Sequence, residues 1–365
     1  MQKKMIVLAI AAAMAAPAAF AADASNVTVY GKVDMAFGST DSGTARNTQV
    51  SSQVTKVGFK GAEDLGDGLS AIWQIEQQID IDNAGGTNST KNTLASRNSF
   101  LGLKSNDMGT VLLGRHDTPY KIATRGLDVF GDQFADNRQL MGGLGQDKGG
   151  TMDARPTNVV AYISPAMNGF KAAVAYAVNT EVATAGKDKG SIWSLAGMYD
   201  QDGIYGAVGY QTIKYTNVAG TQGQFVGAAG DRLSAWKIGG GYKVEAFNLG
   251  AVYEKTSSSI GGLDTLGRTN YTLAGQYNFS NNDVKLSYTH AGNTNGVGAT
   301  GANMIGVGFD HNFSKRTSLY AQYAQISNNA GAAYTFGTAA STAAIAGVAA
   351  GGKPSGFMVG VKHAF

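Results

Sequence analysis

Apolar and small polar residues alternate along most of this chain in runs of about ten residues. Residues 271–279 place Tyr, Leu, Tyr and Phe on one face and Thr, Ala, Gln and Asn on the other. The segments 170–178, 247–254 and 305–313 repeat the pattern. Successive side chains of a β-strand point to opposite faces, whereas a helix would need apolar residues three and four apart. The alternation therefore predicts an all-β chain.

The length of these runs and the composition of their polar face favour a membrane barrel. Soluble sandwiches have strands of about 5–6 residues, whereas a tilted membrane crossing needs about 9–11. The polar face consists of Gly, Ser, Thr, Asn and Gln, which suit a water-filled lumen better than a packed core. Aromatic residues near the strand ends, such as Tyr271 and Phe279, suit the two membrane interfaces.

The first 21 residues differ from the rest. Lys3 and Lys4 precede an apolar run at 5–16, Pro17 breaks the run, and Ala-Phe-Ala follows at 19–21. This order predicts a cleaved secretory signal peptide at 1–21 and a barrel domain at 22–365, whereas a buried helix would explain neither the charges nor the Ala-x-Ala. No later run of 18 apolar residues follows. The exported chain is thus either soluble or a barrel.

Short turns and long loops alternate between the predicted strands. Gly, Asn and Asp residues predict tight turns at 64–68, 106–109, 165–169, 201–203, 281–282 and 314–316. Long polar segments predict loops at 38–52, 81–96, 119–152, 179–189, 216–230, 257–268, 292–302 and 327–354. Short periplasmic turns and long external loops are typical of outer-membrane barrels. We expect about 16 antiparallel strands, from 27–37 to 357–365, because an even number lets the last strand pair with the first.

Several other classes of function lack their residues. The chain has no Cys, which excludes thiolate catalysis and Cys-ligated zinc, and its four His lack zinc-site spacing. The Gly-rich run 347–353 imitates a phosphate loop, but Pro354 stands where Ser or Thr is needed. Ser287 and His290 lie on opposite faces of their strand, which defeats a catalytic pair. With 29 basic and 26 acidic residues and no basic cluster, we predict no enzyme activity, metal, cofactor or nucleic-acid partner.

Five segments together resemble the Gram-negative general porins. They are the first strand at 27–34, the second strand and first turn at 57–66, strands four and five at 97–104 and 109–115, and a C-terminal strand at 359–365 typical of the β-proteobacterial branch. The resemblance implies an outer-membrane homotrimer of 16-stranded barrels, each with a pore for ions and small polar solutes narrowed by an inward-folded third loop. It also implies contact with membrane lipid and lipopolysaccharide.

The C-terminal residue has two interpretations. Phe365 shares a face with Phe357, Val359 and Val361 and ends the chain on an aromatic ring. The resemblance implies that the barrel-assembly machinery reads this strand. An ordinary last strand that ends in an interfacial aromatic residue predicts the same side chain.

The resemblance also places a basic wall at the narrowest part of the pore, where field and width set selectivity. Its candidates are Lys32, Lys56, Arg97 and Arg155, and strand parity adds Lys60. Parity places Lys32, Lys56 and Lys60 on the inward face. It places Arg97 outward, although a bulge or a subunit interface can break the pattern.

The acidic side of the constriction is expected on the third loop. This loop carries Asp128, Asp132 and Asp136, which would oppose the basic wall and create a transverse field. The Pro-Glu that often precedes Phe-Gly in the family is absent, and Asp-Val-Phe-Gly-Asp stands there. Solvated loop carboxylates, and lumen lysines away from the constriction, are the alternatives. An excess of basic wall residues predicts a weak anion preference.

Three functions compete. The leading prediction is a general diffusion porin. A solute-specific channel should show an ordered aromatic track in the lumen, but inward aromatic residues are few, Tyr30 and Tyr320 being the clearest. An adhesin barrel would use its external loops and have a plugged or narrower pore.

Overall fold

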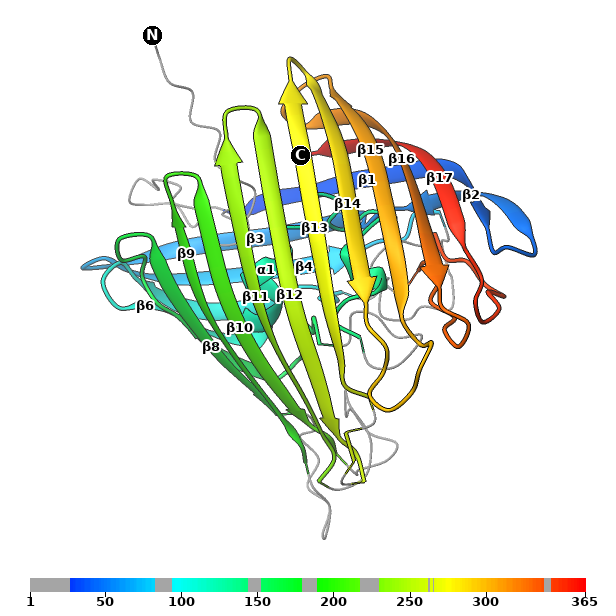
Figure 1. The fold of residues 1–365 in the computed structure, drawn as a ribbon. Coiled ribbons are helices and arrows are strands. Elements are labelled where there is room, and N and C mark those ends of the chain that lie inside the picture. Colours follow the sequence, from blue (N-terminus) through cyan, green and yellow to red (C-terminus); the bar gives the residue numbers. More distant parts are fainter. Residues whose placement is uncertain are drawn as a thin grey trace.

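A single sheet closes on itself to form the wall of the molecule (Figure 1). The computed structural model describes residues 27–82, 94–143, 152–178, 189–216, 230–261, 263–264, 266–337 and 343–365. Its strands are β1 (Thr28–Asp41), β2 (Arg46–Ser52), β3 (Lys56–Gly66), β4 (Leu69–Gln78), β5 (Ser99–Ser105), β6 (Gly109–Arg115), β7 (Val159–Ile163), β8 (Phe170–Val178), β9 (Ser191–Gln201), β10 (Ile204–Lys214), β11 (Arg232–Val244), β12 (Phe247–Ser259), β13 (Arg268–Phe279), β14 (Asn282–Ala291), β15 (Ala302–Asn312), β16 (Thr317–Asn328) and β17 (Ser355–Ala364).

These segments form sixteen wall strands, as predicted. β2 and β3 pair with consecutive parts of β1, so together they act as one strand interrupted at residues 53–55. Val54 has a φ of 62° at this break, a left-handed conformation that interrupts the ladder. β17 pairs with β1 from Lys32↔Ala364 to Asp41↔Ser355. All pairings are antiparallel, and this last one removes the sheet edge.

One predicted loop is wrong. Residues 38–52 were expected to form an external loop, but β1 continues to Asp41 and β2 begins at Arg46. The turn between them is short because the Ser42 hydroxyl accepts hydrogen bonds from the backbone of Thr44 and Ala45. Most residues of this ladder are polar on both faces, so their composition resembles that of a loop. The six predicted tight turns all join consecutive strands, and a seventh at 245–246 was missed.

The two faces of the wall differ as the alternation predicted. On β11, side chains alternate between exposed and buried over most of the strand. Ile238, Leu273 and Leu286 are each more than half exposed on the outward face, while the neighbouring Thr272 and Ser287 are buried inward. Leaving a large aliphatic side chain in water forfeits about 1.5–3 kcal/mol, so this outward face requires lipid. None of the helices in the described part of the chain is long and apolar enough to cross a membrane.

The long segment between β6 and β7 carries the main helical structure. α1 (Pro119–Arg125) begins after Thr118, whose hydroxyl accepts a hydrogen bond from the backbone of Lys121, with Pro119 in the first turn. A 3₁₀ turn, η2 (Asn137–Gln139), follows an Asp136 cap. α1 contacts β8, β9, β10 and β11. This segment positions the candidate site.

Candidate pore constriction

Glycines on the inward face admit the segment between β6 and β7. A Cβ added at Gly308 would lie 2.6 Å from a Phe130 ring carbon, and one at Gly241 would lie 2.7 Å from a Leu127 methyl group. Both glycines alternate with outward apolar residues, so the face that carries them is the inward one. Larger side chains at these positions would push the segment away from the wall.

A wall carboxylate anchors two parts of this segment. Glu254 on β12 is fully buried. It accepts hydrogen bonds from the Tyr120 hydroxyl at 2.7 Å, the backbone N–H of Gly142 at 2.9 Å and the Asn270 amide at 2.8 Å. Tyr120 lies in the first turn of α1 and Gly142 follows η2, so one side chain holds both helical parts of the loop.

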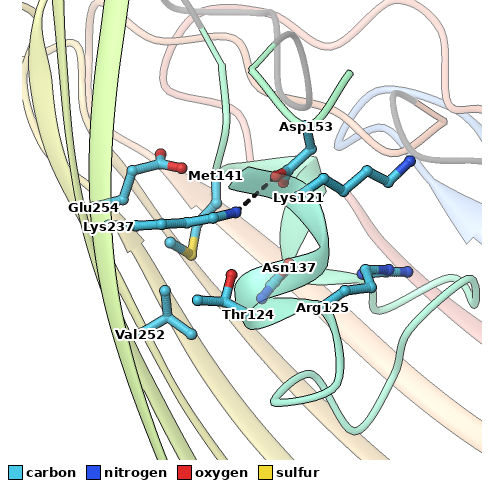
Figure 2. Close-up of a pocket in the computed structure, with 9 residues that line it drawn as sticks. All are labelled: Lys121, Thr124, Arg125, Asn137, Met141, Asp153, Lys237, Val252 and Glu254. Atoms are coloured by element: carbon cyan, nitrogen blue, oxygen red, sulfur yellow. Dashed lines mark hydrogen bonds and ion pairs between the residues drawn. The ribbon is translucent and has the colours of Figure 1, made fainter. Parts of the chain in front are cut away.

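A small cavity lies between α1 and the strands β11 and β12 (Figure 2). Lys237 on β11 forms an ion pair with Asp153 at 2.7 Å across it and lies 4.0 Å from the centre of the Tyr120 ring. The lining residues are Lys121, Thr124, Arg125, Asn137, Met141, Asp153, Lys237, Val252 and Glu254. The buried Lys237–Asp153 ion pair holds the loop to the wall.

On the loop itself, two arginines bind three aspartates. The Arg125 guanidinium contacts Asp128 at 3.3 Å, Asp132 at 3.0 Å and Asp136 at 2.5 Å. Arg138 contacts Asp132 at 2.9 Å and Asp136 at 2.7 Å. Backbone N–H groups of Asp132 and Arg138 also donate to Asp136. Charge-assisted bonds of this density give the loop a defined shape.

The pKa values of the loop carboxyls diverge because their partners differ. Burial, together with the neighbouring Asp136 carboxylate, raises the pKa of Asp128 to about 6. Burial also opposes ionisation of Asp132, but the guanidinium groups of Arg125 and Arg138 hold its pKa well below the usual range. The positive charges of Arg97 and Lys32 lower the pKa of Asp132 further.

The wall opposite this cluster has its own charge network. Glu76 on β4 binds Lys56 at 3.0 Å and Arg97 at 2.5 Å, and it accepts a hydrogen bond from the Tyr30 hydroxyl at 3.1 Å. Lys32 pairs with the buried Asp34 at 3.2 Å. The wall therefore presents cations that are already partly compensated by carboxylates.

A third group joins the base of the loop to the wall. Asp117 binds Lys121 at 2.7 Å and Arg155 at 2.9 Å, and Arg155 also donates to Asn98 at 2.9 Å. Burial, reinforced by the nearby Arg155 charge, lowers the pKa of Lys121 to about 7. The charge of this lysine therefore changes near neutral pH.

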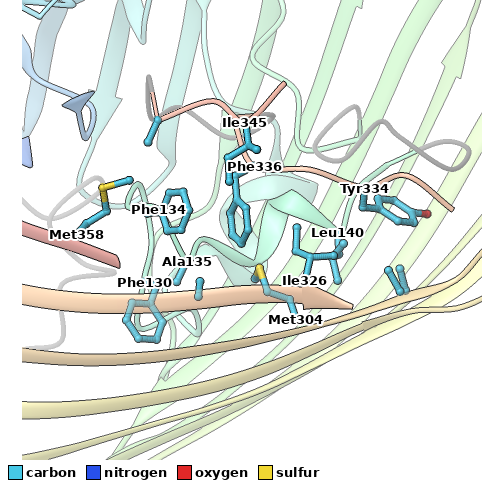
Figure 3. Packing of buried hydrophobic residues seen from close by; sticks show 14 of the residues in the cluster. Phe130, Phe134, Ala135, Leu140, Met304, Ile326, Tyr334, Phe336, Ile345 and Met358 are labelled. Atoms are coloured by element: carbon cyan, nitrogen blue, oxygen red, sulfur yellow. The ribbon is translucent and has the colours of Figure 1, made fainter. Parts of the chain in front are cut away.

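The segment after β16 packs against the loop between β6 and β7 (Figure 3). The Phe336 ring stacks on Phe134 with centroids 4.1 Å apart. Arg268, only 2% exposed, donates to the Leu140 carbonyl at 2.8 Å and to the Tyr334 hydroxyl. The apolar cluster includes Phe130, Phe134, Leu140, Met304, Ile326, Tyr334, Phe336, Ile345 and Met358. It packs against the inward faces of β15, β16 and β17.

A family model described as Gram-negative porin matches residues 8–331. The chain belongs to the Gram-negative porin family. Outer membrane porin protein 32 of Delftia acidovorans is 29% identical over 394 aligned residues that cover both chains completely. Major outer membrane protein P.IA of Neisseria meningitidis serogroup B is 27% identical over 320 residues, 78% of each chain. The solved anion-selective porin from Comamonas acidovorans has a TM-score of 0.78 and 25% identity, and the match covers 94% of this chain and 100% of that one.

Family and fold place this porin in the outer membrane as a β-barrel channel protein, which confirms the predicted family, the 16-stranded antiparallel barrel and the location. The structure brings Lys32, Lys56 and Arg97 to one stretch of wall: Lys32 and Lys56 are direct partners across β1 and β3, and Lys56 and Arg97 both bind Glu76. Strand parity placed Arg97 outward, but Arg97 lies just before β5, outside the strand, and its side chain is buried against Glu76.

The remaining predicted residues lie in different places. Arg155 joins the Asp117 group. Asp128 and Asp136 are bound within the loop. Lys60 lies 5.2 Å from the centre of the Tyr30 ring, four residues nearer the short turns than Lys56. Phe365 exchanges two 3.1 Å backbone hydrogen bonds with Gly31 and is 45% exposed.

Sequence reasoning missed the partners of these residues. Glu76 has the inward parity of Gln74 and Gln78, so parity could have found it. Arg125 and Arg138 stand in the same loop as the three aspartates, but no spacing rule indicated that they would bind them. Glu254 gave no signal, because its loop partners are more than a hundred residues away. Among the described residues, no group of three or more His, Cys, Asp or Glu could hold a metal ion.

Proposed function

We propose that this porin passes ions and small hydrophilic solutes by passive diffusion, prefers anions weakly, and catalyses no reaction. The observation that carries the proposal is the near balance of charge around the candidate constriction, with a small positive excess. A neutral pore would not discriminate by charge, and a strongly basic one would bind anions too tightly to release them quickly.

The charge balance follows from the ion pairs. The cations are Lys32, Lys56, Arg97, Lys121, Arg125, Arg138 and Arg155. The carboxylates are Asp34, Glu76, Asp117, Asp128, Asp132 and Asp136. Seven against six leaves a formal excess of one positive charge. Salt screens charge over about 8–10 Å, comparable to a pore radius, so the resulting preference is small.

The geometry supports a solute path between the loop and the wall of β1–β5. Asp132, Arg125 and Arg138 belong to the loop, and Lys56 and Arg97 to the wall side. The apolar cluster packs the loop against β15, β16 and β17. The third loop thus narrows the pore and sets a transverse field across the path. The similarity to a porin described as anion-selective supports the same sign of preference.

Planar bilayers test this proposal. Purified porin should give discrete conductance steps, and a salt gradient should give a reversal potential displaced slightly toward that of the anion. A reversal potential displaced toward that of the cation would overturn the anion preference. Absence of any step would refute diffusion altogether. Saturable block by a single solute would favour the solute-specific alternative.

We further propose that three copies associate through the side of the wall that is formed by the short strands β5, β6 and β7. β5, β6 and β7 have seven, seven and five residues. Seven tilted residues rise about 16 Å, against a hydrocarbon thickness of about 30 Å. The outward side chains there are mainly aliphatic, including Leu101, Leu103, Val111 and Leu113. A strand too short to span lipid is protected when a neighbouring subunit covers it. Sedimentation in mild detergent should give the mass of three chains, and a monomer mass would refute this.

Two further expectations concern export. Residues 1–21 lie outside the described residues, and we propose that they are removed as a signal peptide; N-terminal sequencing of the purified porin tests this. We also propose that the barrel-assembly machinery reads Phe365. Replacement by Ser should slow insertion without changing the conductance of the molecules that do insert.

A further inference from the structure

Two tyrosine rings lie on the inward face of the wall, Tyr30 on β1 and Tyr320 on β16. Each ring lies against a glycine of the neighbouring strand. Tyr30 is the direct ladder partner of Gly58, and Tyr320 is that of Gly360. A Cβ added at either glycine would overlap the facing ring. The two glycines therefore leave the space that each phenol ring fills.

Each tyrosine hydroxyl donates a hydrogen bond to a carboxylate of the wall. Tyr320 donates to Asp34 Oδ1 at 2.8 Å, and Tyr30 donates to Glu76 Oε2 at 3.1 Å. A donor that binds an ionised carboxylate stabilises its negative charge. The hydroxyl groups therefore fix both carboxylates in place and favour their charged form.

The same two carboxylates bind the basic residues of this stretch of wall. Asp34 pairs with Lys32 at 3.2 Å. Glu76 pairs with Lys56 at 3.0 Å and with Arg97 at 2.5 Å. Lys32 and Lys56 are direct partners across the β1–β3 ladder, so the two groups adjoin. Three cations against two carboxylates leave this wall with one positive charge, where the cations alone would give three.

The cations and the carboxylates differ in their access to solutes. The side chains of Lys32 and Lys56 are 18% and 26% exposed, whereas those of Asp34 and Glu76 are 0% and 7% exposed. A solute in the lumen can therefore touch the ammonium groups but not the carboxylates. The buried carboxylates act on it through their field alone, which weakens the attraction of an anion without blocking its contact with the lysines.

The third loop carries its charges in a separate group. Arg125 and Arg138 of the loop itself bind its three aspartates. Three carboxylates against two guanidinium groups give the loop an excess of one negative charge. A change at Asp34 or Glu76 therefore alters the charge of the wall without removing an ion-pair partner from this group.

We propose that Asp34 and Glu76 determine the strength of the anion preference of this pore. They are fixed counter-charges that hold the wall near neutrality while its lysines stay in contact with solutes. This role rests on the proposed diffusion pore, whose path runs along this wall. Anions can then meet the wall cations and still leave quickly, because conduction requires binding that is weak enough for release.

Reversal potentials of single channels in a salt gradient at pH 8 test this role. The variant Asp34→Asn/Glu76→Gln removes two negative charges from the wall. Two unit charges about 10 Å away in 0.1 M salt change the anion-to-cation permeability ratio about threefold, so this ratio should rise by that factor. The matched control Glu63→Gln/Asp107→Asn removes two carboxylates that are exposed beside the short turns, and its ratio should stay at the wild-type value.

A second variant tests the same carboxylates without removing them. Lys32→Gln/Lys56→Gln takes two cations from the wall and leaves Asp34 and Glu76 in place. Because the two carboxylates then outnumber the remaining wall cation, the pore should prefer cations. An anion preference that persists in this variant would overturn the role of the two carboxylates. The conductance steps of each variant show that it has formed a pore.

The remaining outcomes separate this role from the proposed function. An unchanged permeability ratio in Asp34→Asn/Glu76→Gln would refute the role of the two carboxylates and leave the diffusion pore intact. An equal rise in the Glu63→Gln/Asp107→Asn control would do the same, because it would assign the effect to the total charge of the porin. A wild-type porin without conductance steps would instead refute the diffusion pore, and this role with it.

Discussion

Lowering the pH from 8 to 5 should strengthen the anion preference of the pore. Two buried groups beside the proposed path titrate in this window. Lys121 has a pKa lowered to about 7 by burial and by the Arg155 charge, so it gains a proton and a positive charge as the pH falls. Asp128 has a pKa raised to about 6 by burial and by the Asp136 carboxylate, so it loses its negative charge. Both changes make the constriction more positive.

The size of the effect follows from these values. At pH 8 Lys121 is about one-tenth protonated and Asp128 is ionised, whereas at pH 5 both are protonated, a gain of about two positive charges. Unit charges 10 Å apart in water interact by about 0.4 kcal/mol, which screening in 0.1 M salt reduces to about 0.15 kcal/mol. Two charges favour an anion by about 0.3 kcal/mol and disfavour a cation equally. The anion-to-cation permeability ratio should therefore rise about threefold.

Reversal potentials in a salt gradient, recorded on single channels at pH 8, 6.5 and 5, measure this ratio. The double variant Lys121→Arg/Asp128→Asn keeps the low-pH charge at every pH, so its potential should stay near the wild-type value at pH 5. A wild-type potential that does not move across this range would refute the reasoning. A pH response that persists in the double variant would assign the titration to other groups.

Three further changes test the site. Lys56→Glu places a second carboxylate beside Glu76 and should lower the anion preference; an unchanged reversal potential would place Lys56 outside the conduction path. Phe336→Ala removes the ring stacked on Phe134 and should cost about 3–5 kcal/mol of local stability. The thermal unfolding temperature should fall and the single-channel current should become noisier. Current noise at the wild-type level would show that the stack does not hold the loop. Arg125→Met leaves the buried Asp128 carboxylate without a guanidinium partner, at a cost of about 3–5 kcal/mol. Protease cleavage of the loop should therefore accelerate, and wild-type resistance would contradict the role of this cluster.

The sequence predicted the wall because strand alternation is a local property. Each outward residue meets lipid and each inward residue meets water or the loop, so residues 271–279 specify their strand without reference to distant parts of the chain. Tight turns were likewise readable from Gly, Asn and Asp. The segment 38–52 shows the limit: outside the membrane both faces of a strand are polar, alternation disappears, and a ladder has the composition of a loop.

The sequence by itself determined the closed barrel and the inward direction of Lys32 and Lys56, which strand parity gives, whereas parity placed the buried Arg97 outward. The tertiary structure decided what those charges do. Glu254 holds a loop more than a hundred residues away, Phe336 stacks on a ring about two hundred residues earlier, and Arg125 binds three carboxylates that the composition would have counted as available to solutes. Charge compensation depends on separations of a few ångströms between side chains brought together by the fold, and no local pattern encodes those separations.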